Sequence, residues 1–130
     1  MALTPSNMLP LGTSAPDFSL PSTTGSAISL DDFRDSPLLL VAFICNHCPF
    51  VKHIRARLAA LADEYQPKGV AFVAINANDT QAYPDDSMDN MKKEVVTAGY
   101  HFPYLLDELA RLLLSTIPWI RHGRVPKRCQ

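Results

Sequence analysis

The sequence predicts an α/β fold built around a parallel β-α-β unit, and three observations support this prediction. Residues 38–44 are apolar without charge or alternation, as in a strand that is buried on both faces of a sheet. An amphipathic helical pattern follows over residues 50–65. A second apolar run, residues 70–75, comes after the helix, and a strand in this position pairs in parallel through a right-handed crossover. We expect residues 38–44 to be a central strand.

Two segments precede this unit. Residues 1–12 are expected to form a loose N-terminal arm, followed by a domain over residues 13–120. The domain begins with a short β-hairpin, because residues 18–20 and 28–30 flank the turn signal Thr24-Gly25.

The motif Cys45-Asn46-His47-Cys48 lies between the first apolar strand and the helix. Backbone N–H groups and the helix dipole stabilise a thiolate at a helix N-terminus, and a cysteine three residues further on can resolve a mixed disulfide. We expect Cys45 to attack as the more exposed thiolate with the lower pKa, and the more buried Cys48 to resolve. Asn46, as an amide donor, and His47, as a cation near neutral pH, are expected to tune the cysteine pKa.

The helix after the motif is expected to bury one apolar stripe and to end at Pro67 and Gly69. Because a cap at Cys45 would place Pro49 inside the first turn, we expect that turn to be irregular. The members of the stripe are Phe50, Ile54, Leu58, Leu61 and Tyr65.

The second apolar strand leads into a polar loop at residues 76–80, where Asn and Asp are expected to make turns. A helix then begins at Asp85 or Ser87, runs through Ala98 and stops at Gly99. Residues 102–106 predict a short strand, which Pro103 places at an edge. The apolar side of the helix is predicted to contain Met88, Met91, Val95 and Val96.

Metal binding is an alternative use of the motif, because Cys45, His47, Cys48 and His53 are all zinc-capable residue types. A structural zinc site needs a second ligand pair, and the sequence holds no second CxxC or HxxxH. We therefore predict neither a metal nor another cofactor, and a metal-binding module through Cys45 and Cys48 stays an alternative.

Several segments resemble the thioredoxin-like redoxins of the alkyl hydroperoxide reductase and thiol-specific antioxidant family, in its peroxiredoxin-like branch with a CNHCPF motif. The resemblance covers about residues 9–108. It implies a thioredoxin-like fold, with a central mixed sheet and flanking helices, and maps the family's redox cysteines onto Cys45 and Cys48. The segments that carry the resemblance are APDFSL from Ala15, FICNHCPFVKH from Phe43, AINAND from Ala74, and YPDDS from Tyr83 through Met91.

The function predicted from the motif and the resemblance is that of a thiol-disulfide oxidoreductase. Its partners would be a protein or small-molecule disulfide as substrate and an external dithiol as reductant. The peroxidatic cysteine of typical peroxiredoxins lies in a PxxxTxxC setting, and here Leu38 and Ala42 hold the proline and threonine positions. The hydroxyl that would help to orient peroxide is missing, so disulfide exchange is the better interpretation. A peroxide-reducing redoxin and a truncated, inactive homologue are alternatives.

Composition agrees with one small domain in the cytoplasm. The 130 residues are 47% hydrophobic with a formal charge of −1, which gives no reason to expect nucleic acid or a membrane as partner. The first residues lack the pattern of a signal peptide, and three cysteines cannot make a disulfide framework.

The C-terminal residues depart from the family pattern. Residues 109–130 hold five basic residues and no acidic one, a break in charge that is unusual within one small domain. Pro118 resembles the cis-proline that contacts substrates in thioredoxin-like proteins, but no clear strand or helix follows it. We expect the fold to be incomplete at this end, with residues 121–130 a basic, disordered tail.

Overall fold

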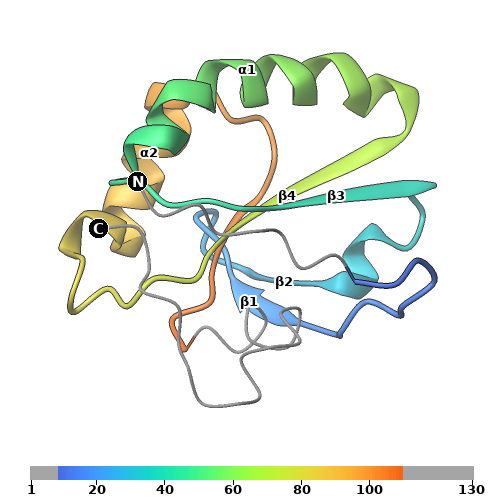
Figure 1. Ribbon diagram of the computed structural model, residues 1–130, viewed down its shortest axis with the longest axis horizontal. Coiled ribbons are helices and arrows are strands. Elements are labelled where there is room, and N and C mark those ends of the chain that lie inside the picture. Colours follow the sequence, from blue (N-terminus) through green and yellow to red (C-terminus); the bar gives the residue numbers. More distant parts are fainter. Residues whose placement is uncertain (1–8, 110–130) are drawn as a thin grey trace.

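The computed structural model of the chain describes residues 9–109 and contains two sheets (Figure 1). A parallel three-stranded sheet has the order β3 (Leu38–Phe43), β4 (Val70–Asn76), β5 (Tyr104–Leu106). An antiparallel hairpin joins β1 (Ser19–Pro21) and β2 (Ala27–Ser29). The helices are α1 (Pro49–Tyr65) and α2 (Met88–Ala98), and the 3₁₀ turns are η1 (Leu30–Phe33), η2 (Gln66–Lys68) and η3 (Pro84–Asp86).

The parallel sheet separates two hydrophobic cores. In Figure 1 α1 lies above β3 and β4, α2 lies at their left end, and the hairpin lies below them. The upper core joins α1 and α2 to the sheet through residues such as Ala62, Phe72 and Met91. The lower core joins the hairpin and η1 to β4 and β5 through Phe18 and Leu105. Other elements thus pack against both faces of the sheet, which suits its apolar strands.

The predicted β-α-β unit is confirmed. Strands β3 and β4 pair in parallel from Leu38 opposite Val70 to Phe43 opposite Ile75, with α1 between them in the chain. The hairpin and α2 are also confirmed, and α2 begins after Ser87 and ends at Gly99, whose φ of 70° is left-handed.

The prediction that residues 38–44 form a central strand is wrong for the described part of the chain. There β4 is central, and β3 pairs with β4 alone. Leu38, Val41 and Phe43 are accordingly 63%, 41% and 38% exposed. An unbroken apolar run indicates a strand that can be buried on both faces, but it does not rank the strands within the sheet.

The predicted apolar stripe of α1 is also largely wrong. Of its members only Leu58 packs against the upper core, and the other four are exposed. Helix α1 instead turns Ala59 and Ala62 to the core, because small side chains let the helix approach β4 closely. On α2, Met88, Met91 and Val95 face the core as predicted, whereas Val96 is exposed.

Some predictions concern residues outside the described range. The tail at residues 121–130, the role of Pro118, the incomplete C-terminus and most of the N-terminal arm fall there. Within residues 9–109, no helix is long and apolar enough to cross a membrane.

Candidate redox site

The CxxC motif lies in a loop between the carboxyl end of β3 and the start of α1. The N-cap of α1 is Cys48, whose carbonyl accepts the first helical hydrogen bond from Lys52 N at 3.0 Å. Pro49 therefore occupies the first helical position, where a missing N–H costs nothing. The expected cap at Cys45 and irregular first turn are both corrected by this arrangement.

The two cysteines differ in accessibility as predicted. Cys45 is half-buried, whereas Cys48 is only 3% exposed. A substrate sulfur can therefore reach Cys45 more readily than Cys48.

Asn46 fastens the loop to the rest of the molecule through three hydrogen bonds. Its backbone N donates to Asp86 Oδ1 at 2.7 Å, and its side-chain Nδ2 donates to the Asp85 carbonyl at 2.8 Å. Its Oδ1 accepts from the buried hydroxyl of Tyr104 at 3.0 Å. The loop between the sulfurs is thus anchored to η3 and β5.

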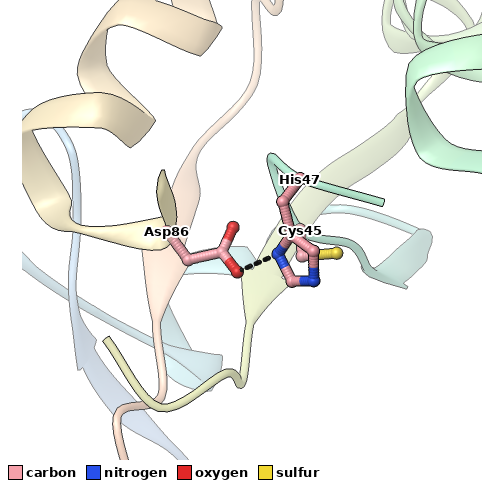
Figure 2. A group of neighbouring side chains, drawn as sticks. All are labelled: Cys45, His47 and Asp86. Atoms are coloured by element: carbon pink, nitrogen blue, oxygen red, sulfur yellow. Dashed lines mark hydrogen bonds and ion pairs between the residues drawn. The ribbon is translucent and has the colours of Figure 1, made fainter. Parts of the chain in front are cut away.

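His47 is held on two sides (Figure 2). Its Nδ1 lies 2.6 Å from Oδ2 of the fully buried Asp86. Its ring stacks on Tyr83 with centroids 4.7 Å apart and planes 2° from parallel. These contacts fix the position and plane of the imidazole.

Asp86 is the residue of this site that the sequence interpretation missed. It lies about 40 positions after Asn46 and His47, with which it forms hydrogen bonds. Asn78, from the polar loop after β4, donates a further hydrogen bond to Asp86 Oδ2 at 2.8 Å. The available signal was that this loop follows β4, so that it reaches the sheet edge at which the CxxC lies.

The polar cluster continues into the sheet. Burial raises the pKa of the Tyr104 hydroxyl well above its usual value, and the charges of Asp86 and Cys45 add to this shift. Asn76, at the end of β4, is also fully buried, and its Oδ1 accepts from Asn78 N at 3.1 Å. The turn chemistry predicted for the loop at residues 76–80 is therefore present, together with a contact to the site.

The described residues contain one group with the side chains to hold a metal ion, formed by Cys45, His47 and Asp86. One ligand atom of each lies within 4.8 Å of the others. Cys48 and His53, which the sequence suggested as ligand types, are not part of the group. The same three side chains are also those of a nucleophile, a base and an orienting carboxylate.

A family model described as the AhpC/TSA family matches residues 11–114. A comparison with curated proteins gives no match. Among solved structures, a hypothetical protein from Sinorhizobium meliloti 1021 is 48% identical with a TM-score of 0.81, over 84% of this chain and 60% of its own. An uncharacterized conserved protein from Geobacillus kaustophilus is 49% identical with a TM-score of 0.81, over 85% of this chain and 59% of its own.

More distant structures share the fold. A secreted Mycobacterium tuberculosis disulfide oxidoreductase is 19% identical with a TM-score of 0.63, over 78% of this chain and 69% of its own. The thioredoxin-like fold, with flanking helices and both parallel and antiparallel sheets, is therefore confirmed. The chain spans about three fifths of the length of the Sinorhizobium and Geobacillus relatives.

Proposed function

This chain belongs to the AhpC/TSA family of thioredoxin-like redoxins, and on that premise we propose that it is a thiol-disulfide oxidoreductase in which Cys45 attacks and Cys48 resolves. The observation that carries the proposal is the pair itself, with a half-buried Cys45 in the loop and a buried Cys48 at the N-cap of α1. A reachable first thiol and a sheltered second thiol suit a two-step exchange.

The reaction is a pair of thiol-disulfide exchanges. The Cys45 thiolate attacks one sulfur of a substrate disulfide, which forms a mixed disulfide and releases one thiol. Cys48 then attacks Cys45 Sγ, which releases the second thiol and leaves a Cys45–Cys48 disulfide. An external dithiol reduces this disulfide and closes the cycle. The substrate is a protein or small-molecule disulfide, and the proposal places the reaction in the cytoplasm with no nucleic acid or membrane as partner.

The test is reduction of a protein disulfide by the purified chain with excess dithiol. Cys45→Ser is expected to abolish turnover. Cys48→Ser, mixed with the substrate disulfide in the absence of dithiol, should accumulate a mixed disulfide on Cys45 that mass spectrometry detects. Iodoacetamide should label Cys45 before Cys48. Labelling of Cys48 first at pH 6 would reverse the two roles, and turnover that survives Cys45→Ser would overturn the proposal.

A further inference from the structure

We propose that Cys45, His47 and Asp86 form a proton-transfer triad, in which His47 takes the thiol proton of Cys45 and returns it to the thiol that leaves the substrate. This inference rests on the proposed disulfide exchange and adds the substrate class that the site suits. That class is disulfides of aliphatic thiols, whose thiolates are poor leaving groups without an acid beside them.

The Asp86 side chain accepts hydrogen bonds as a carboxylate. It is fully buried, yet three donors surround it: Asn46 N at 2.7 Å on Oδ1, and Asn78 Nδ2 at 2.8 Å and His47 Nδ1 at 2.6 Å on Oδ2. These hydrogen bonds compensate the burial of the carboxylate. Asp86 is therefore built as an acceptor that orients other groups, and we assign it as a positioning residue.

The two ring nitrogens of His47 have different roles. A carboxylate has no hydrogen to give, so the proton between His47 and Asp86 belongs to Nδ1. Nε2 is then the nitrogen that can exchange a proton with Cys45. In the view of Figure 2 the Cys45 sulfur and the Asp86 carboxylate both lie beside the imidazole, and one ligand atom of each of the three residues lies within 4.8 Å of the others.

With His47 beside both a thiol and a carboxylate, one proton can serve both halves of the exchange reaction. The Cys45 thiol gives its proton to His47 Nε2, and Asp86 stabilises the imidazolium that forms. The thiolate attacks the substrate disulfide, a new S–S bond forms to Cys45, and the substrate S–S bond breaks. The leaving sulfur takes the proton from His47, so the products are a mixed disulfide and a neutral thiol. The substrate disulfide is the only oxidant required.

The imidazole of His47 also borders a cavity. His47, Tyr83 and Asp85 line a cavity of about 290 Å³ together with Ala82 and Pro84. The Tyr83 ring, which stacks on His47, forms one wall of this cavity and makes that wall aromatic.

Metal binding by the same three residues is the competing interpretation. It is disfavoured because both Asp86 oxygens already accept hydrogen bonds, and Oδ2 accepts two. A metal ion on Oδ2 would have to displace Asn78 or His47.

Other titratable groups face the site and must be separated from His47 in any pH profile. Asp85 and Tyr83 share its cavity, the Tyr104 hydroxyl bonds to Asn46, and Cys48 closes the motif. Lys52, Arg55, Lys93 and Glu94 line a neighbouring hollow with Asn46 and Asp85. The test therefore compares variants with one another and does not rely on a wild-type pH profile alone.

The experiment measures single-turnover reduction of two probes by the full 130-residue chain. One probe is 5,5′-dithiobis(2-nitrobenzoate), whose aromatic thiolate leaves without help, and the other is oxidised glutathione, whose aliphatic thiol needs a proton. His47→Gln is expected to slow the glutathione reaction about 10²-fold and the aromatic reaction at least about tenfold less. Asp86→Asn should show the same selectivity, and the double variant should be no slower than His47→Gln.

The matched control is His101→Gln. His101 also pairs with a carboxylate, at 2.8 Å from Asp63, but both side chains are largely exposed and lie outside the triad. The His101→Gln variant should reduce both disulfide probes at the wild-type rates. Equal slowing of both probes by His47→Gln, or an Asp86→Asn effect that adds to it, would overturn the triad. Tight binding of one zinc ion per wild-type chain, lost in His47→Gln, would replace the triad with a metal site.

A second measurement separates failure of the triad from failure of the proposed function. The rate at which iodoacetamide alkylates Cys45 is measured against pH in two proteins, the Cys48→Ser variant and the Cys48→Ser variant that also carries His47→Gln. The rate should reach its plateau at a lower pH in the protein that keeps His47. If the wild type reduces neither probe but this shift is present, the proposed function fails and the proton transfer stands. If the wild type reduces both probes and the shift is absent, the function stands and the triad fails.

Discussion

Ala42 determines what we expect Cys45 to do with peroxide. In the family pattern a hydroxyl three residues before the cysteine helps to orient peroxide, but Ala42 and its neighbour across the sheet, Ala74, offer none. Cys45 should therefore react with hydrogen peroxide at the rate of an ordinary thiolate of matched pKa. Competition against such a reference thiol measures this, and an advantage of about 10³-fold would favour the peroxidase alternative.

Tyr100 makes the stability of the fold sensitive to high pH. Burial raises the pKa of its hydroxyl to about 12, compared with about 10 in an unfolded chain. Between these values the unfolded chain loses the phenol proton while the folded chain keeps it, so stability falls as the pH rises from about 10 towards 12.

Tyr100→Phe should reduce this loss, since phenylalanine has no proton to release. Urea midpoints at pH 9 and pH 11 measure the effect, and some loss should remain because burial also raises the pKa of Tyr104. Tyr65→Phe, at an exposed tyrosine, is the control and should keep the wild-type dependence. An unchanged dependence in Tyr100→Phe would assign the loss to other groups.

Helix α2 offers a direct test of which of its apolar residues holds it on the sheet. Met91 is fully buried in the upper core, whereas Val96 on the same helix is 82% exposed. Met91→Ala should lower the free energy of unfolding by about 2–5 kcal/mol. Val96→Ala should change it by no more than about 0.5 kcal/mol. Similar losses from both, measured by urea denaturation, would contradict the described orientation of α2.

The two helices also show that an apolar pattern predicts a helix better than it predicts which face of the helix is buried. On α2 the predicted side was right at Met91 and wrong at Val96, and on α1 only Leu58 of the predicted stripe reached the core. Periodicity locates a helix because backbone geometry is local. The face that packs depends on how closely the helix approaches the sheet, and here Ala59 and Ala62 determine it.

At the scale of the whole sheet, the described residues leave part of the apolar strand β3 exposed. Val41 belongs to β3, the outer strand of the described β3-β4-β5 order, and is 41% exposed. An outer strand with exposed apolar side chains can pair with another chain. We expect self-association that increases with protein concentration, measured by sedimentation velocity. Val41→Lys should shift the chain towards monomer, whereas Val96→Lys on α2 should not. A wild type that stays monomeric at every concentration would show that this edge is covered.

The sequence was sufficient to predict the order of the helices and strands and the place of the cysteine motif between them. It was not sufficient to predict the role of Asp86 or the position of β3 in the sheet, and both failures have the same physical origin. The formation of strands and helices, and the spacing of the two cysteines, depend on residues that are close in the sequence. Asp86 is brought to His47 by the path of β4 and the loop after it, so its burial has no local signature. The same holds for β3, whose place at the edge of the sheet within residues 9–109 depends on which strands pair with it.

The stack of Tyr83 on His47 gives this imidazole a magnetic environment of its own. With the rings 4.7 Å apart and nearly parallel, the ring current of Tyr83 shields the carbon-bound protons of His47. Their resonances should lie upfield of those of His53 and His101, for which the described residues show no such stack. The protonation of His47 can therefore be followed in the intact protein by the shifts of these resonances.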